Sequence, residues 1–317
     1  MKKLLNTLYI TKQESYLHKE RETIVIKQGK EKLGQFPAIS IANILCFGQV
    51  SVSPFLMGYC GEQSIGLAFY TEYGKFLARV QGKQTGNVLL RRSQYRWADD
   101  EEKSISIARL MVAAKISNGR SVLMRDIRNH GENVILSEAA NKLAVSLRRA
   151  QHAQSVSEAM GIEGDAASTY FGVFNELLRG SGFTFCGRVR RPPTDPVNAL
   201  LSYVYTLITH ECSSALQGVG LDPYVGFLHQ DRPGRQSLAL DLLEEFRASW
   251  ADRFVLTLIN RKQIQLNDFV TEASSASKLK SCILILKSKC RLACYPIVRP
   301  CYWPGISVAT PNIIRLT

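Results

Sequence analysis

The sequence predicts an α+β protein in which an N-terminal β-sandwich-like domain precedes a larger all-α domain. Up to about Arg79, apolar residues form short or alternating runs separated by turn-like residues, a pattern typical of strands. From about Val88, apolar residues recur at the three- and four-residue spacing of helices. The 317 residues are enough for two domains that each bury a core. We therefore expect a β-rich domain at 1–88, a helical domain at 89–272 and an atypical tail at 273–317.

Five strands and one short helix are expected in the first domain. Turn-like residues at 28–30 and 72–74 separate some of the apolar runs. Ser53 is a suitable N-cap for a helix at 53–60, because its hydroxyl can accept a backbone N–H and Pro54 suits the first helical position. The predicted strands are Leu4–Tyr9, Thr23–Lys27, Ile39–Leu45, Ile65–Tyr70 and Lys75–Val80.

Seven helical segments are expected after residue 88. A proline-rich joint at 190–196 leads into a long apolar helix, because proline is tolerated before a helix and at its first position. The predicted helices are Ile105–Ile116, Ser121–Ile127, Leu136–Ala150, Ala166–Leu178, Val197–Cys212, Leu238–Phe246 and Ala251–Ile259.

The composition excludes several classes of protein and favours a polyanionic partner. With 45% hydrophobic and 21% charged residues, the chain is neither a disordered tail, a collagen nor a coiled coil. It has no run of 18 apolar residues and no apolar stretch of signal-peptide length after Met1, so we expect a cytoplasmic protein with no membrane contact. The net charge of +13 suggests nucleic acid as partner, although net charge reports non-specific attraction and not a site.

The eight cysteines fall into two groups. Cys46, Cys60, Cys186 and Cys212 stand singly among apolar neighbours, as buried thiols do. The other four lie within twenty residues in the tail, without a C-x-x-C pair or a histidine, so a zinc site there is an alternative that does not match the usual ligand spacing. They are Cys282, Cys290, Cys294 and Cys301. Disulfides are not expected in a cytoplasmic protein.

Carboxylates and one histidine are the candidates for chemistry. A short apolar run delivers His229 to a polar loop that contains glycine and proline, a typical position for a functional side chain. On the next helix, Asp241 shares one face with Glu244 and Glu245. Close carboxylates repel each other unless a cation separates them, although a solvated acidic face is the alternative for this segment. Glu163 begins a helical stripe that otherwise looks buried, and a buried carboxylate needs a cation or an acid network. Carboxylates with one imidazole suit Mg²⁺ or Mn²⁺.

Four ordered motifs carry a resemblance to a known family. They are Ile162–Phe171, Arg191–Ser202, Gly220–His229 and Ser237–Arg247. Together with the opening Met1–Tyr9, they resemble the CRISPR-associated adaptation endonuclease/integrase, the universal first CRISPR-associated protein, and are most similar to its subtype I-C branch. Ser168 departs from that pattern, because many relatives have an arginine there.

The resemblance implies an N-terminal β-sandwich used for homodimerisation and an all-α catalytic domain. It implies metal ligands at Glu163, His229 and Glu244, with Asp241 supporting the site and Glu245 the less favoured partner. The implied activity is metal-dependent cleavage of DNA and, with a second small CRISPR adaptation protein, insertion of new spacers into a CRISPR array. The implied substrates are duplex or branched DNA and the CRISPR repeat.

Five arginines flank the acidic residues in the sequence. We expect them to bind backbone phosphates of DNA, with a solvated surface charge as the alternative for each. They are Arg188, Arg190, Arg191, Arg232 and Arg235.

The resemblance ends after about Ser274. Residues 273–317 contain seven basic and no acidic residues, without helical periodicity. We hypothesise that a shifted reading frame produced this tail and expect it to be poorly ordered; a diverged terminus is the alternative. Such a tail favours a second function, a catalytically impaired DNA-binding scaffold subunit of the same adaptation complex.

Overall fold

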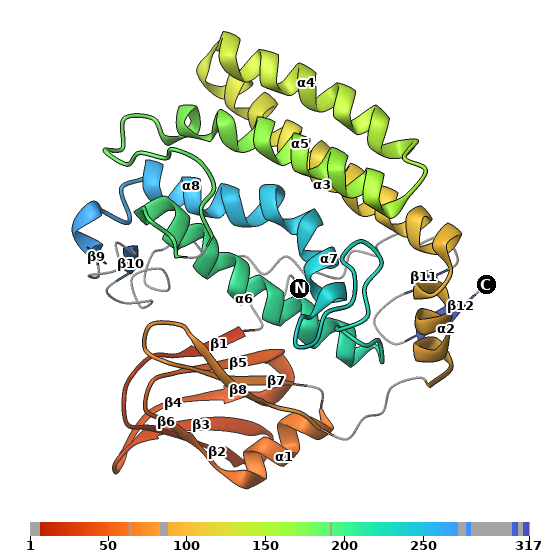
Figure 1. Ribbon diagram of the computed structural model, residues 1–317. Coiled ribbons are helices and arrows are strands. Elements are labelled where there is room, and N and C mark those ends of the chain that lie inside the picture. The colour runs from red at the N-terminus through yellow and green to blue at the C-terminus, as the bar shows by residue number, and fades with distance from the viewer. Residues whose placement is uncertain are drawn as a thin grey trace. The chain divides into compact units, whose positions relative to one another are not determined.

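The computed structural model describes residues 7–63, 65–82, 88–190 and 192–271, together with the backbone of three strands at 277–279, 306–309 and 313–316 (Figure 1). The main part of the chain falls into two compact units, one up to residue 82 and one from residue 88. The first unit is built of strands and the second of helices, so the predicted α+β class is confirmed.

The first unit contains two four-stranded sheets and helix α1 (Pro54–Glu62). One sheet has the order β1 (Thr7–Ile10), β5 (Asn43–Phe47), β7 (Gly66–Tyr70) and β8 (Phe76–Val80). The other has the order β4 (Glu31–Pro37), β3 (Thr23–Gln28), β2 (Ser15–Glu20) and β6 (Val50–Val52). Strands β1, β5 and β7 are parallel, whereas β2, β3 and β4 form an antiparallel meander.

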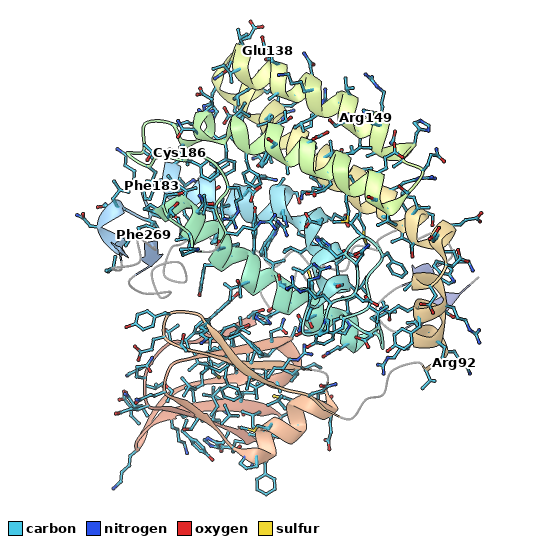
Figure 2. The ribbon with its side chains drawn as sticks, in the orientation of Figure 1. Arg92, Glu138, Arg149, Phe183, Cys186 and Phe269 are labelled. Atoms are coloured by element: carbon cyan, nitrogen blue, oxygen red, sulfur yellow. The ribbon has the colours of Figure 1, made fainter. Side chains whose placement is uncertain are left out.

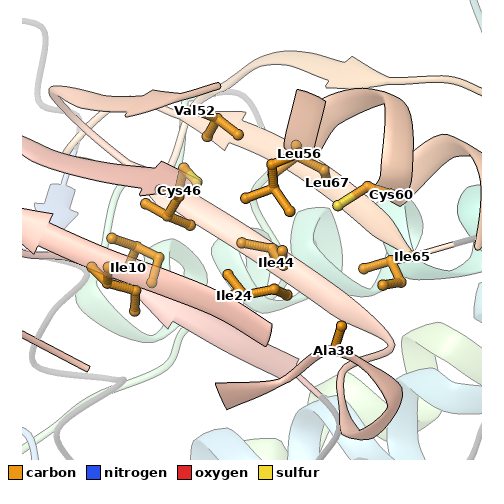
Figure 3. Close-up of a cluster of buried hydrophobic side chains, with 12 residues drawn as sticks. Ile10, Ile24, Ala38, Ile44, Cys46, Val52, Leu56, Cys60, Ile65 and Leu67 are labelled. Atoms are coloured by element: carbon orange, nitrogen blue, oxygen red, sulfur yellow. The ribbon is translucent and has the colours of Figure 1, made fainter. Parts of the chain in front are cut away.

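Side chains from both sheets and from α1 form one apolar core (Figure 3). Leu17 and Ile24 come from one sheet, Ile44 and Leu67 from the other, and Leu56 from α1, and all five are essentially inaccessible to solvent. Burying residues of this size contributes about 1.5–3 kcal/mol each to folding. Two sheets that share a core make the sandwich-like domain that the sequence predicts.

The strand predictions succeed where the turns have glycine. Gly29 and Gly74 have positive φ angles at the two predicted turns, and Ser53 accepts a hydrogen bond from Leu56 N as the N-cap of α1. The prediction missed β2, β4 and β6, because the first two are rich in polar residues and the turn between β2 and β3 uses Arg21 at φ 51° in place of glycine. The predicted strand Ile39–Leu45 begins too early, since residues 38–40 form a 3-10 turn and β5 starts at Asn43.

The second unit consists of helices, most of them joined by short connections and two by longer ones at residues 173–195 and 219–236. They are α2 (Val88–Ala98), α3 (Glu101–His130), α4 (Val134–Gln151), α5 (Val156–Gly172), α6 (Pro196–Gly218), α7 (Ser237–Phe246) and α8 (Arg253–Asn260), with a π-helical segment, Arg247–Asp252, between α7 and α8. Figure 1 shows α3, α4 and α5 side by side, and these three helices contact one another. Helices α3 to α6 begin at capping residues, which are Asp100, Asn133, Ser155 and Asp195.

Three helix predictions need correction. The segments Ile105–Ile116 and Ser121–Ile127 are one continuous helix, α3, which passes through Gly119 without a break. Helix α5 starts ten residues before Ala166, so Glu163 lies in its middle and not at its start. The π-helical segment was not expected, since its sequence has no feature that distinguishes it from an α-helix. None of the helices in the described part of the chain has the length and apolarity to cross a membrane.

The cysteine prediction holds for three of the four single residues. Cys46, Cys60 and Cys212 are buried, and burial raises the pKa of Cys46 to about 12. Cys186 is exposed, which contradicts the prediction, because it lies in the irregular connection between α5 and α6 (Figure 2). In the same view Phe183 of this connection packs edge-on against Phe269, with ring centroids 6.0 Å apart.

Most of the tail lies outside the described residues. The four-cysteine cluster with its alternative zinc site is among those residues, and so is Arg191. The described parts are β10 (Ser277–Leu279), which pairs with β9 (Phe269–Thr271), and the antiparallel pair β11 (Ile306–Ala309) and β12 (Ile313–Leu316). The reading-frame hypothesis stays a prediction.

Candidate active site

Asp241 on α7 holds the loop that carries His229. Its carboxylate is 0% exposed and accepts hydrogen bonds from the backbone N–H groups of Phe227 at 2.7 Å, Leu228 at 2.9 Å and His229 at 3.0 Å. A fourth contact joins Asp241 Oδ1 to His229 Nδ1 at 2.6 Å. In the neutral imidazole, this contact places the proton on Nδ1 and leaves the lone pair on Nε2. Carboxylates orient metal-binding histidines in the same way.

The loop before His229 is fixed from two further sides. Gln94 of α2 donates to the carbonyl oxygens of Asp222 at 2.7 Å and Val225 at 2.8 Å, and its own oxygen accepts from Asp222 N at 2.8 Å. Gly226 lies against α7 so closely that a Cβ there would be 2.7 Å from Asp241 Oδ2. The backbone can therefore approach Asp241 only because residue 226 has no side chain.

Glu163 of α5 and Glu244 of α7 meet through a third residue, Lys115 of α3. Lys115 Nζ forms an ion pair with Glu163 Oε1 and a second one with Glu244 Oε2, at 2.5 Å in the latter. Arg247 Nη2 contacts the other oxygen, Glu244 Oε1, at 2.9 Å. The Glu244 side chain is only 3% exposed, and that burial alone would raise its pKa. The positive charges of Lys115 and Arg247 outweigh burial and hold the pKa of Glu244 at about 2, so the carboxylate is ionised.

The structure brings the predicted residues together in two pairs. Glu163 and Glu244 share Lys115, and His229 pairs with Asp241. A protonated His229 would also lower the pKa of Glu244, so the imidazole lies within electrostatic range of that carboxylate. Within the described residues, however, no three His, Cys, Asp or Glu side chains are spaced to hold a metal ion as they stand. Glu245 contributes its backbone carbonyl, which accepts from Asn118 Nδ2 at 2.9 Å.

The donor chemistry nevertheless fits a divalent ion. Glu244 Oε2 is buried, and Lys115 Nζ is its charge partner at 2.5 Å. Two carboxylates and an imidazole with a free Nε2 are ligands that Mg²⁺ and Mn²⁺ accept. Glu163, His229 and Glu244 could hold such an ion once Lys115 is no longer between the carboxylates.

A second buried carboxylate, Asp252, lies within electrostatic range of Arg247, the residue that contacts Glu244. Tyr205 of α6 donates its hydroxyl to Asp252 Oδ1 at 2.5 Å, and Arg247 stacks over the Tyr205 ring at 4.9 Å. Burial raises the pKa of Asp252 to about 6. A cavity of about 30 Å³ lies between this residue and Lys115, and it is lined by small and aromatic side chains of α3 and α5. Those side chains include Gly119, Ala166, Ala167, Tyr170 and Phe171.

The arginines predicted to bind DNA differ in whether they already make contacts within the protein. Arg188 donates to Asn198 Oδ1 at 2.7 Å and to Ser202 Oγ at 3.0 Å, and it stacks over Tyr205. Arg235 donates to the Gln230 carbonyl oxygen and to Ser237 Oγ, which braces the loop after His229. Arg190 and Arg232 are exposed.

Three residues of this site were not predicted from the sequence. Lys115, Gln94 and Arg247 act through partners that are distant along the chain or on another face of a helix. A buried position for a charged or amide side chain within an apolar helical stripe is the one feature that could have pointed to them.

Comparison with known proteins assigns the family. Residues 8–284 match the family model described as CRISPR associated protein Cas1. The chain belongs to the Cas1 family. The Cas1 match ends ten residues beyond Ser274, where we expected the resemblance to stop.

Similar Cas1 proteins cover nearly the whole described chain. A CRISPR-associated endonuclease Cas1 of Chlorobaculum tepidum is 50% identical over 285 residues, which are 88% of this chain and 83% of that protein. Among solved structures, a Cas1 protein from Thermotoga maritima has a TM-score of 0.74 and 26% identity over 89% of this chain and 88% of that chain. A casposase bound to its integration product shares the fold with a TM-score of 0.73 and 24% identity, over 89% of this chain and 81% of that chain.

Proposed function

We propose that this Cas1-family chain is a divalent-metal-dependent DNA endonuclease and integrase subunit of the subtype I-C branch, which inserts new spacers into a CRISPR array. The observation that carries the proposal is the buried Asp241, which fixes His229 within electrostatic range of the ionised Glu244 carboxylate. The endonuclease name of the half-identical relative and the fold shared with a casposase support the same chemistry.

The ion would be held by Glu163, His229 and Glu244, with either Mg²⁺ or Mn²⁺ as cofactor. When bound, such an ion neutralises charge on a scissile phosphate and activates the attacking hydroxyl or water. Asp241 keeps the proton on His229 Nδ1 and so keeps Nε2 available as a ligand. Arg247 keeps Glu244 ionised and fixes its position, because it contacts the oxygen that faces away from Lys115.

DNA would be bound by arginines beside this site. Arg190 and Arg232 are the favoured phosphate contacts, because both are exposed, whereas Arg188 and Arg235 hold neighbouring parts of the protein. We further propose that the chain works as a homodimer together with a second small CRISPR adaptation protein; the fold it shares with a chain of a Cas6-RT-Cas1–Cas2 complex supports the second partner.

The experiment that tests the proposal compares His229→Ala with the wild-type chain in cleavage and strand transfer on branched DNA, with Mn²⁺ or Mg²⁺. We expect a loss on the order of 100-fold, since even partners that only orient a metal-binding histidine cost 10–100-fold when removed. His152→Ala is the matched control, because that side chain is exposed at the end of α4 and should leave activity unchanged.

Equal activity of the wild type and His229→Ala would contradict the metal-site assignment. DNA binding without cleavage in either protein would instead support the second candidate, the catalytically impaired scaffold. The tail at 273–317, with seven basic and no acidic residues, is the observation that favours this candidate.

A further inference from the structure

Lys115 neutralises the carboxylate pair from within the protein. Its ammonium forms ion pairs with both Glu163 and Glu244, and its side chain is only 12% exposed. Arg247 supplies a second positive charge to Glu244. The two glutamates are thus balanced by two cations of the same chain, which together carry the charge that a divalent ion would supply.

We infer that Lys115 is a built-in counter-ion that holds the two glutamates together in the free protein and leaves them when a divalent ion binds. This inference rests on the proposed metal site. Like charges at contact distance repel strongly in a site with little solvent, so Lys115 and the ion cannot both lie between the carboxylates. Binding of the ion is therefore an exchange of one cation for another.

The two cations around Glu244 differ in their freedom to move. Arg247 is 8% exposed and its guanidinium is stacked on Tyr205, so it is fixed on two sides. Lys115 has a flexible four-carbon stem and lines the cavity of about 30 Å³ beside Gly119 and Ala166. Lys115 is thus the cation that can withdraw.

An exchange of cations predicts two effects of opposite sign. Removing the charge of Lys115 leaves two carboxylates in mutual repulsion, so the metal-free protein should unfold at a lower temperature. The same change removes the competitor, so the affinity for the ion should increase. Replacing a residue that only supports the fold would lower both the melting temperature and the affinity for the ion.

The test uses the full chain and titrates Mn²⁺ into wild type, Lys115→Met, Lys115→Gln and Lys115→Arg. Free Mn²⁺ is followed by electron paramagnetic resonance, and the melting temperature is measured separately in EDTA. We expect Lys115→Met and Lys115→Gln to bind Mn²⁺ at least about tenfold more tightly and to melt lower in EDTA. Lys115→Arg keeps the charge and should restore both wild-type values. Lys103→Met is the matched control, since Lys103 lies on the same helix and is half-exposed.

The outcomes separate this inference from the proposed function. If wild type binds Mn²⁺ and both neutral variants bind it equally or more weakly, the exchange is wrong and the metal site stands. If Mn²⁺ binds none of these proteins more tightly than it binds His229→Ala, the metal site itself is wrong and the inference falls with it. The Gln variant keeps a polar, hydrogen-bonding side chain, so a folding failure of Lys115→Met alone does not decide the matter.

Discussion

Glu244 and Asp252 are both buried and lie eight positions apart in the sequence, yet their surroundings shift their pKa values in opposite directions. Glu244 is in contact with Lys115 and Arg247, and their charges bring its pKa to about 2 in spite of burial. Asp252 has as its closest partner the neutral hydroxyl of Tyr205, so burial prevails and its pKa rises to about 6. One carboxylate is therefore charged at every physiological pH, while the other changes its charge near pH 6.

The pKa of Asp252 predicts how stability changes with pH. Because the folded-state pKa of about 6 exceeds the ordinary value of 3.8, the folded protein holds this proton more tightly than the unfolded chain does. The contribution of this proton to the free energy of unfolding is complete below about pH 4 and is lost as the pH rises through about 6. Asp252→Asn has no such proton, so its free energy of unfolding should fall less than that of the wild type over this range in urea titrations. Asp165→Asn, an exposed change on α5, should keep the wild-type slope.

Local patterns in the sequence pointed to four candidate residues but not to the residues that contact them from distant parts of the chain. His229, Asp241, Glu163 and Glu244 stand in recognisable local patterns, and the structure joins them in pairs. Lys115 acts on Glu163 across 48 residues of chain, a relation that local spacing does not encode. The same holds for Gln94, whose partners lie about 130 residues away.

Helix α3 connects several parts of the site. Over its 30 residues it supplies Lys115 to the glutamates and Asn118 to α7, and it packs against α4 and α5. The sequence indicated two shorter helices, because Asn118 and Gly119 are poor helix formers. Tertiary packing overrides this preference, since Gly119 is buried against the ring of Tyr170.

Two glycine-to-alanine changes should act in opposite directions. A Cβ at Gly119 would lie 3.5 Å from Tyr170, an ordinary packing distance, so Gly119→Ala should stabilise the protein by about 0.5–1 kcal/mol through a lower cost of ordering α3. A Cβ at Gly226 would lie 2.7 Å from Asp241 Oδ2, so Gly226→Ala should destabilise it by about 1–3 kcal/mol. Urea unfolding measures both, and a destabilising Gly119→Ala would show that α3 does not tolerate the added methyl group.

At the scale of the whole molecule, the separation into a strand-rich part and a helical part could be predicted from the sequence. The change of apolar period near residue 88 separates the sandwich from the helical unit, and both units appear in the structure. The polar strands β2 and β4 could not be predicted in this way, because they are stabilised by pairing with β3 and not by an apolar pattern of their own. The π-helical segment escaped prediction for a similar reason, since only its packing distinguishes it from an α-helix.

Charge at the molecular scale yields a prediction for DNA binding. Replacing Arg190 and Arg232 together by alanine should reduce the slope of log affinity against log salt by roughly 2, about one for each phosphate that an arginine no longer neutralises. Lys30 and Lys32, both exposed in the strand-rich unit, provide a control pair that removes the same charge. Equal slopes in the two double variants would mean that net charge, and not a specific surface, governs binding.

The residues that form ion pairs with Lys115 are far from it in the sequence, so the order of synthesis limits when these contacts can form. A chain that has left the ribosome only as far as Gly218, the end of α6, contains Lys115 and Glu163 but neither His229 nor Glu244. Domains fold as units once enough of them has emerged, N-terminal parts first. The strand-rich unit can therefore fold early, whereas the contacts of Lys115 and His229 with α7 can form only after α7 has been made.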